Sequence, residues 1–538
     1  MNKSVSTYFF LMLQNSPVQL LILAIIILNI YGHSLNAPFY LDDYPSIHDN
    51  LHIHTLNLND IWNYAPFRFV TYTSFALNYH FHQLDVFGYH LVNMIIHFLV
   101  GCGIYYFVKV LICIPKINLQ ASNDIQNWLP FLSALIFIIH PLHTQAVTYI
   151  VQRLASLAAL FYILSIAFYI HARLIFSTFS KKIILFSCAI IFATLALFTK
   201  ENTVTLIMII PCIELVFFQK TITSRFVIMG SILITFFSFW MLYGFIRNID
   251  PFSLTQIDTF TRLGTDISRS TYLYTQLKII WIYIRLFFFP IGLHLDYDIL
   301  PGSPDWTVFI ALTGHLVVMV CAFMMRKQQP VILFSILFYY TTHLIESSII
   351  PIKDFCFEHR AYLPDIGLSI LCAYIIINTY RNACSTSFRY TIIGLLTIIF
   401  SVFGMVTWQR NHVWNDPIAF WQNCSIYSPQ KTRVWAELGK HLMIAKQNKK
   451  AIAAFNNALR YSVDSSGQQK LNVQIICNLI ILLHKTGDSE KAIHLADQAL
   501  QHPINNLFRF YILNNKIREI YFLKTKILPG LKHVIVRQ

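Results

Sequence analysis

The sequence predicts an all-α protein in which a polytopic membrane bundle is followed by an α-solenoid domain. Of its 538 residues, 56% are hydrophobic and only 12% are charged, and the mean hydropathy is +0.55. This composition is typical of a chain with many membrane spans. Apolar runs recur as far as residue 408 and then give way to amphipathic segments of helical period. We therefore expect a transmembrane domain over 1–410 and a soluble helical domain over 411–538.

Eleven apolar runs are long enough, or nearly so, to cross about 30 Å of hydrocarbon. They fall at about 18–36, 89–112, 128–142, 146–170, 183–199, 202–218, 226–246, 306–325, 331–350, 361–379 and 390–408. A twelfth apolar segment, 272–290, carries Lys278 and Arg285 seven residues apart, which places both on one helical face. Counting this segment as a span would move every later loop to the other side of the membrane.

Basic residues in the loops predict the orientation. If Met1 is cytosolic and 272–290 does not cross, the inner loops contain a single acid, Asp124, and eleven bases: Lys109, Lys116, Arg173, Lys181, Lys182, Lys220, Arg225, Arg326, Lys327, Arg381 and Arg389. This is the positive-inside pattern. It predicts that 272–290 is an amphipathic helix in the outer interface and that the C-terminus is non-cytosolic. Because orientation explains the net charge of +15, no nucleic-acid partner is expected.

The segment after residue 410 matches tetratricopeptide repeats. We expect two units, at about 432–465 and 473–505. Because two units rarely bury a core alone, the helix at 417–427 and the apolar tail 507–530 are expected to cap them. The matching residues are Trp435, Leu438, Gly439, Leu442, Ala451, Phe455 and Ala458 in the first unit and Leu479, Leu483, Ala492, Ala496 and Ala499 in the second.

Asp42 and Asp43 are the candidate chemical centre. They follow the first apolar run directly, in a segment predicted to form short helices on the outer side, and their neighbours are aromatic and apolar. Such surroundings can raise the pKa of a carboxyl group and prepare a general base. The alternative is that this Asp-Asp-x-Pro segment is only a turn with capping side chains.

With the predicted orientation, most other polar side chains at membrane depth gather on the same outer side. Such groups are costly in a membrane and usually functional, so their convergence favours a reactive site. They are Arg68, His90, Asn93, His140, His143, Arg153, Lys200, Glu201, Glu358 and Arg360.

Several of these residues also have simpler interpretations. His90 and Asn93 lie on one helical side and are consistent with polar contacts between spans. His140 and His143 resemble a metal pair, but no third ligand is nearby, which favours a helix-end structure or a substrate contact. The neighbours Lys200 and Glu201 could form only a local ion pair.

The basic residues differ in what they could bind. Arg360, at an outer entrance, suits bidentate contact with a phosphate, and Arg153 lies about two turns inside a span. Lys278 and Arg285 could either extend toward the interface or hold a lipid phosphate.

In their order along the chain these motifs resemble the transmembrane and tetratricopeptide repeat family of protein O-mannosyltransferases, over about residues 20–500. The motifs are Asp42-Asp43, Arg68 with Leu77-Asn78-Tyr79, Gly88-Tyr89-His90-Leu91-Val92-Asn93 with His97, His140-Pro141-Leu142-His143-Thr144, Lys200-Glu201, Glu358-His359-Arg360-Ala361-Tyr362-Leu363-Pro364, and Gln409-Arg410-Asn411 with Trp414.

The resemblance implies a multi-spanning glycosyltransferase that takes a sugar from a polyprenyl-phosphate donor on the non-cytosolic side. It implies that an acid of the first outer loop is the catalytic base, and it favours Asp42 over Asp43. Donor phosphate would be held by Arg360 with Arg153, Lys278 or Arg285. The remaining polar residues would contact substrate or support the site, and the acceptor hydroxyl would attack the anomeric carbon with inversion.

The resemblance also leaves choices open. Eukaryotic members carry longer repeat arrays, so two units suggest a bacterial relative in the inner membrane, with a protein Ser/Thr or another glycan as acceptor held by the repeats. Leu41 directly precedes the acid pair, a position where related sequences often have an aromatic residue.

A phosphate neutralised by basic side chains needs no metal, although an Asp pair can bind one. Rival functions are sugar transfer to a lipid or surface polysaccharide, and a non-catalytic scaffold or lipid transporter.

Overall fold

The computed structural model describes residues 15–118, 122–175, 179–218, 265–462 and 473–501, with isolated residues between 219 and 264. Over these ranges the secondary structure is helical and contains no β-strand, which confirms the predicted all-α class. The chain divides into two compact units, Met1–Leu293 with Ile299–Asn415 and His294–Asp298 with Asp416–Gln538. Each unit is described below by itself.

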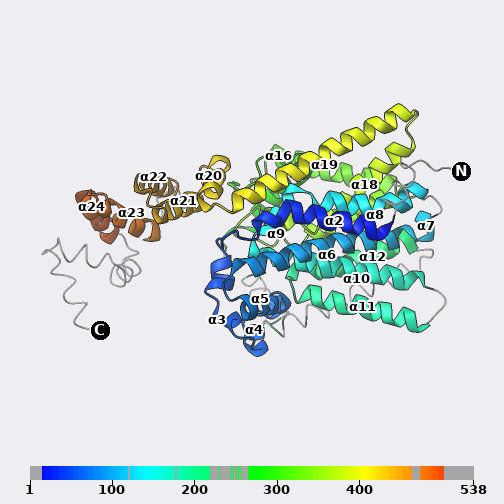
Figure 1. The fold of residues 1–538 in the computed structure, drawn as a ribbon, viewed down its shortest axis with the longest axis horizontal. Helices are drawn as coiled ribbons and strands as arrows, with labels where there is room; N and C mark the ends of the chain where they lie inside the picture. The colour runs from blue at the N-terminus through cyan, green and yellow to red at the C-terminus, as the bar shows by residue number, and fades with distance from the viewer. Residues whose placement is uncertain are drawn as a thin grey trace. The chain divides into compact units, whose positions relative to one another are not determined.

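The first unit is a bundle of long helices with short helices and turns between them (Figure 1). The longer helices are α2 (Ser16–Tyr31), α5 (Phe69–His82), α6 (Val86–Ile112), α8 (Asn123–Ile138), α10 (Arg153–Leu174), α11 (Phe179–Leu197), α12 (Leu206–Ile213), α15 (Arg269–Phe288), α16 (Trp306–Met324), α17 (Pro330–His343), α18 (Asp365–Arg381) and α19 (Thr386–Trp414). The short helices are α3 (Leu51–His54), α4 (Leu58–Tyr64), α7 (Pro115–Asn118) and α9 (Thr144–Thr148), and tight 3-10 or π turns include Tyr44–His48, Pro141–His143, Ile150–Gln152, Glu201–Thr205 and Glu358–Ala361.

Seven helical segments of the described ranges are long and apolar enough to cross a membrane, which makes this a multi-pass membrane protein. They are Ser16–Ser34, Val86–Ile112, Ile150–Leu174, Phe179–Leu197, Glu201–Phe218, Trp306–Met324 and Thr386–Trp414. A further segment, Asp124–Ile138 with Pro141–Thr148, is bent by 54° and would make eight as a broken span.

The predicted count of eleven spans is not confirmed. Helix α17 has 14 residues and α18 has 17. Both are shorter than the roughly 20 residues that a helix needs to span the hydrocarbon core of a bilayer. The predicted span 226–246 lies outside the described ranges. Helix α15, which covers the predicted interfacial segment 272–290, has 20 residues and is not among the candidate spans. Its position at an interface stays a prediction.

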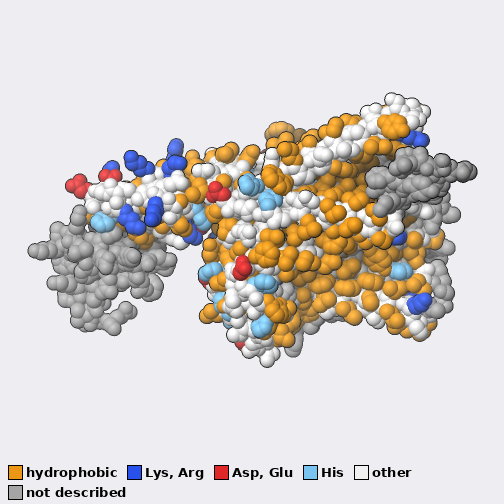
Figure 2. Space-filling view, viewed as in Figure 1, with side chains coloured by type: hydrophobic (Ala, Val, Ile, Leu, Met, Phe, Trp, Pro, Cys, Tyr) orange, Lys and Arg blue, Asp and Glu red, His pale blue; other side chains and the backbone are white. Residues whose placement is uncertain are grey.

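Helices α6, α8 and α10 pack closely in the bundle. A Cβ on Gly103 of α6 would lie 2.8 Å from Ile163 of α10, and one on Gly101 would lie 2.8 Å from Ile138 of α8. The two glycines therefore let the three helices approach more closely than any larger residue would allow. On the outside, hydrophobic side chains cover much of the face of the helices that Figure 2 shows, as a lipid-facing surface requires.

Between α2 and α6 the chain forms α3, α4 and α5 over a small core of its own. Ile47, Ile53, Ile61 and Phe75 are fully buried there. Asn50 and Asn57 begin α3 and α4 by accepting backbone N–H groups two residues ahead, the usual role of an N-cap asparagine. This segment carries the acid pair at its start.

The second unit consists of helices α20 to α24, with bounds Pro417–Tyr427, Thr432–Ile444, Asn448–Arg460, Val473–Lys485 and Ser489–Gln501. A Cβ on Gly439 of α21 would lie 2.8 Å from the ring of Phe455 of α22, so the ring packs directly on the glycine. The interpretation as tetratricopeptide units stays a prediction, since 463–472 and the tail 507–530 lie outside the described ranges.

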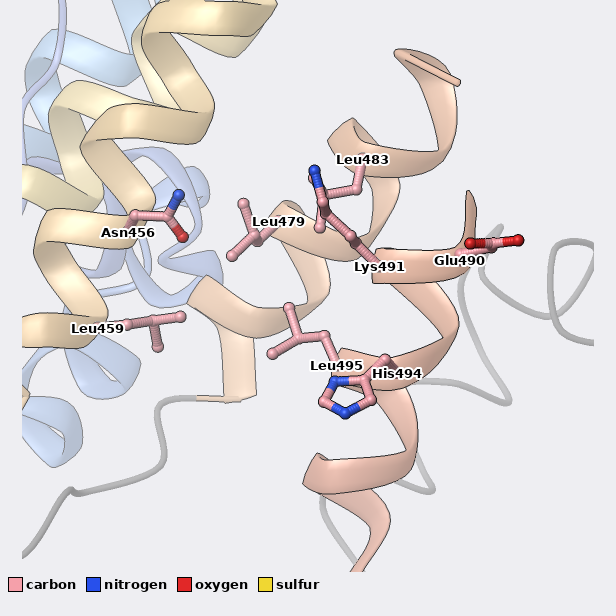
Figure 3. A pocket seen from close by; sticks show the side chains of 8 residues that line it. All are labelled: Asn456, Leu459, Leu479, Leu483, Glu490, Lys491, His494 and Leu495. Carbon is pink, nitrogen blue, oxygen red and sulfur yellow. The ribbon is translucent and has the colours of Figure 1, made fainter. Parts of the chain in front are cut away.

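Helices α22, α23 and α24 line an open pocket of about 450 Å³ (Figure 3). It is lined by Asn456, Leu459, Leu479, Leu483, Glu490, Lys491, His494 and Leu495. Elsewhere in this unit, the buried carboxylate of Asp296 pairs with Arg433 at 2.6 Å and with Lys431 at 3.4 Å. These ion pairs anchor the inserted segment His294–Asp298.

Candidate active site

Asp43 is fully buried in the turn after α2. Its Oδ2 accepts a hydrogen bond from the backbone N–H of Tyr40 at 2.9 Å, and its Oδ1 accepts one from the N–H of Val151 at 2.7 Å. The side chain therefore fastens this turn to the segment that leads into α10. Burial raises the pKa of Asp43 to about 8, against the effect of the two N–H donors, which favour the charged form.

Asp42, by contrast, is exposed. Its backbone N–H donates to the hydroxyl of Tyr149 at 2.8 Å. The residue before it, Leu41, has a φ of 33°, a left-handed conformation that a non-glycine residue keeps only where its surroundings impose it. The backbone around Asp42 is thus fixed on both sides, so its carboxylate is presented from a rigid turn.

Aromatic residues form the support beneath this turn. The Tyr40 hydroxyl donates to the backbone carbonyl of Trp414 at 2.6 Å, and the two rings meet edge to face with centroids 5.2 Å apart. The Tyr149 ring lies 5.9 Å from that of Trp414. Because Trp414 is the last residue of α19, the C-terminal end of α19 lies directly against the acid pair's turn.

Arg153 and Asn93 hold the same region from inside the bundle. Arg153 is fully buried, and its three guanidinium nitrogens donate to Asn93, Ser74 and the carbonyl of Tyr89. The amide of Asn93 in turn donates to the carbonyls of Val147 and Ile150. These contacts favour a positioning role for Arg153, since every nitrogen already has a protein partner.

Three histidines predicted to belong to the site also bond to protein groups. His90 donates to the carbonyl of Ala37 at 2.8 Å. His140 donates through Nε2 to the carbonyl of Phe287 and accepts the N–H of Leu142 at Nδ1. His143 bonds to the carbonyl of Phe137 and contacts Asp365 at 3.1 Å. This favours the helix-end interpretation of His140 and His143. Across the described residues, no group of three or more possible ligands could hold a metal.

Lys200 and Glu201 pair with different partners rather than with each other. The ammonium of Lys200 lies 2.8 Å from Oε1 of Glu346. Nε of Arg68 lies 3.3 Å from both oxygens of Glu201. The first pair is buried, whereas the Arg68 side chain is 42% exposed. Lys200 and Glu201 therefore link this part of the chain to two separate segments, one at Glu346 and one at Arg68.

Arg360 is 5% exposed and lies in the turn before α18. Its Nη1 donates to the carbonyl of Phe355 at 3.0 Å, and its guanidinium lies 5.5 Å from the centre of the Phe357 ring. Among the ion pairs of the described residues, none includes Arg360. A buried cation in this state is unfavourable unless a bound anion balances it, which makes Arg360 a good candidate for binding phosphate.

Glu358, two residues earlier, is fully buried and pairs with Arg410 of α19. Arg410 and Trp414 are four residues apart and so lie on one face of that helix. The same end of α19 therefore contacts both the turn of Asp42 and the segment of Arg360. Of the two buried carboxylates nearby, Glu346 pairs with Lys200 and Glu358 pairs with Arg410, so neither forms an ion pair with Arg360.

Lys278 and Arg285 lie on α15, away from its buried face. Lys278 pairs with Asp305 at 3.1 Å with both side chains about one-third exposed. Arg285 is exposed and makes a long contact of 3.4 Å to the carbonyl of Ile291. The structure does not join these two residues to the group around Arg360.

Sequence reasoning assigned no role to Arg410, Glu346 or Tyr149. Arg410 belongs to the motif Gln409-Arg410-Asn411, directly after the predicted span 390–408. A charge at the end of a span could have marked Arg410 as a candidate site residue. Glu346 lies inside an apolar run, and a lone acid in such a run marks a functional position by default. Nothing in the sequence pointed to Tyr149.

No protein-family model matches the chain, and neither does any solved structure. A protein O-mannosyl-transferase of Caenorhabditis elegans is 26% identical over 460 residues, which cover 82% of this chain and 62% of the relative. The chain is homologous to the protein O-mannosyl-transferases. The resemblance that the sequence motifs suggested is thereby confirmed.

Two shorter matches are also to proteins named protein O-mannosyl-transferases. TMTC3 of Homo sapiens is 32% identical over 157 residues, or 27% of this chain and 16% of the relative. Tmtc3 of Drosophila melanogaster is 31% identical over 170 residues, or 27% of this chain and 18% of the relative. The chain thus spans less than two thirds of these relatives' lengths. All three are animal proteins and give no support to the predicted bacterial origin.

Proposed function

We propose that the protein transfers a hexose, mannose in the first instance, from a polyprenyl-phosphate donor to Ser or Thr hydroxyls of proteins on the non-cytosolic side of a membrane. The homologues named protein O-mannosyl-transferases support this reaction type. Arg360, a buried cation that forms no ion pair among the described residues, supports the donor class, because a phosphodiester between a sugar and a lipid carries one negative charge.

The observation that carries the proposal is the convergence at the end of α19. Trp414 contacts the turn that presents Asp42, and Arg410, one turn earlier, pairs with Glu358 beside Arg360. An exposed carboxylate thus belongs to the same end of the bundle as a buried guanidinium that forms no ion pair within the described ranges. Inverting sugar transfer from a phosphodiester requires two groups: a base for the acceptor hydroxyl and a cation for the leaving phosphate.

In the proposed reaction, Arg360 binds the donor phosphate. Asp42 takes the proton of the acceptor hydroxyl while that oxygen forms a bond to the anomeric carbon. The bond from the anomeric carbon to the phosphate oxygen breaks, and its electron pair leaves with the lipid phosphate. Configuration at the anomeric carbon inverts, and no covalent sugar–enzyme intermediate forms. Asp43 and Arg153 hold the turn rather than react.

The proposed sidedness rests on the basic loops and on α19. This helix has 29 residues, about 44 Å at the usual rise per residue, with Arg389 near its start and the acid pair's turn at its end. Loops rich in Lys and Arg face the cytosol, so we place Asp42 on the opposite side. We further propose that the repeat unit holds the acceptor and that the reaction needs no metal.

The proposal is tested with purified protein in lipid nanodiscs, Ser/Thr peptides, EDTA, and one of three donors: mannosyl polyprenyl phosphate, glucosyl polyprenyl phosphate or GDP-mannose. We expect a hexose mass shift on peptides from a lipid-linked donor and none from GDP-mannose. Transfer from GDP-mannose alone, or to lipid but never to peptide, would contradict the proposal.

A further inference from the structure

Glu346, which follows α17, organises a buried polar group. Its Oε1 lies 2.8 Å from Nζ of Lys200, and its Oε2 accepts a hydrogen bond from Nδ2 of Asn202 at 3.0 Å. Its backbone carbonyl accepts the hydroxyl of Tyr272 at 2.7 Å. Both carboxylate oxygens are therefore used in fixing Lys200 and Asn202 in place.

Polar atoms around this carboxylate have no hydrogen-bond partner among the described residues. They are Oδ1 of Asn202, both ring nitrogens of His343, Nδ1 of His359 and Nε2 of Gln145, and all four side chains are at least 90% buried. Buried polar groups are almost always paired in native proteins. So many unpaired atoms in one region indicate a polar ligand or ordered water.

These residues are held as one group, which we call the Glu346 cluster: Gln145, Lys200, Asn202, His343, Glu346 and His359. The backbone N–H of His359 donates to Gln145 at 2.8 Å. The His343 ring stacks on Tyr283 at 5.4 Å, and the Tyr283 hydroxyl donates to the carbonyl of Phe357, close to Arg360 along the chain. His343 and His359 also interact electrostatically with Arg360, so they lie near the residue proposed to bind phosphate.

We propose that the Glu346 cluster binds the hydroxyl groups of the donor sugar and so sets which sugar the protein accepts. This inference rests on the proposed function and extends it from the phosphate to the sugar. Amide and imidazole groups suit hydroxyls, which both donate and accept hydrogen bonds. The Lys200–Glu346 pair is neutral as a whole, so the cluster does not suit a second phosphate.

The test compares the binding of mannosyl polyprenyl phosphate with that of sugar-free polyprenyl phosphate to protein in nanodiscs. The variants are Asn202→Leu, which removes the unpaired oxygen, and His359→Phe, which keeps the ring that packs at 5.3 Å on Phe357. Asn59→Leu, on the exposed face of α4, is the matched control. A melting temperature for each variant identifies any that fails to fold.

We expect wild type and Asn59→Leu to bind the mannosyl lipid at least about tenfold more tightly than the sugar-free lipid, as two or three hydrogen bonds would give. In Asn202→Leu and His359→Phe this ratio falls toward one, while binding of the sugar-free lipid is unchanged. Equal weakening for both lipids, or an unchanged ratio in both variants, overturns the inference and leaves the proposed function standing. Absence of binding of either lipid to wild type overturns both.

Discussion

The turn of Asp42 and the Glu346 cluster differ in how their buried polar groups are satisfied. At the turn, Asp43, Asn93 and Arg153 bond fully to protein groups, and the reactive candidate Asp42 is exposed. At the Glu346 cluster, several buried atoms remain unpaired. In the first region the protein itself satisfies the buried polar groups, whereas in the second a bound substrate would satisfy them. Substitutions should therefore damage catalysis or folding at the turn and donor binding at the cluster.

The largest effect is expected for Asp42→Asn. If Asp42 is the general base, the transfer rate falls by roughly 10²–10⁴-fold, while the melting temperature stays unchanged because the side chain is exposed. Peptide mannosylation and thermal unfolding measure the two properties. Asp49→Asn, on a side chain that is 66% exposed in the same segment, is the control and should keep its activity. Near-normal transfer by Asp42→Asn would remove the turn from the mechanism.

Arg360→Gln should mainly weaken donor binding. Loss of a charge-assisted contact to phosphate is expected to raise KM for the donor about 10–100-fold, with a smaller change in kcat. Arg360→Lys should fall in between, since an ammonium keeps the charge but not the bidentate geometry. Steady-state kinetics at varied donor concentration measures this, and an unchanged KM in Arg360→Gln would show that the phosphate binds elsewhere.

Asp43→Asn should act on stability. An amide can accept only one of the two backbone N–H groups, so the free energy of unfolding should fall by about 1–3 kcal/mol. Denaturant unfolding in detergent measures the change. A variant as stable as wild type would mean that Asp43 does not fasten the turn.

Asp43 should also make the stability of the protein depend on pH. Because burial raises the pKa of Asp43 from 3.8 to about 8, its contribution to stability is fully present below about pH 4. It is lost as pH rises through about 8. Asp43→Asn should flatten this part of the stability profile measured between pH 4 and 9. A profile identical to that of wild type would contradict the raised pKa.

Lys278→Gln and Arg285→Gln should have the smallest effects. Both residues are partly or fully exposed, and exposed charge pairs contribute about 1 kcal/mol or less. Donor KM should therefore change by less than about fivefold. A change as large as that of Arg360→Gln would assign them to the phosphate site instead.

The helical class and the position of the acid pair could be predicted because apolar runs and a short acidic segment are local properties of the sequence. The number of spans could not, since apolar composition alone does not reveal that α17 has only 14 residues or that the chain bends by 54° near Pro141. Length and bending depend on packing inside the bundle.

The roles within the candidate site divide in the same way. Asp42 and Arg360 were assigned from residue type and place in the chain; in the structure the first is exposed and the second is buried in the turn before α18. From the sequence, Arg153 was expected to help Arg360 hold the donor phosphate. Only the fold surrounds Arg153 with Asn93, Ser74 and Tyr89, which are 60, 79 and 64 residues away. Such long-range partners carry no signal in a single sequence.

The central claim is that one lipid-linked sugar contacts both regions at once. A structure of the Asp42→Asn variant with mannosyl polyprenyl phosphate bound tests it most directly. The account predicts the phosphate within hydrogen-bonding distance of Arg360, about 3 Å, sugar hydroxyls on the Glu346 cluster, and the anomeric carbon facing residue 42. A phosphate bound away from Arg360, or an anomeric carbon that no acceptor held at residue 42 could reach, would contradict the account.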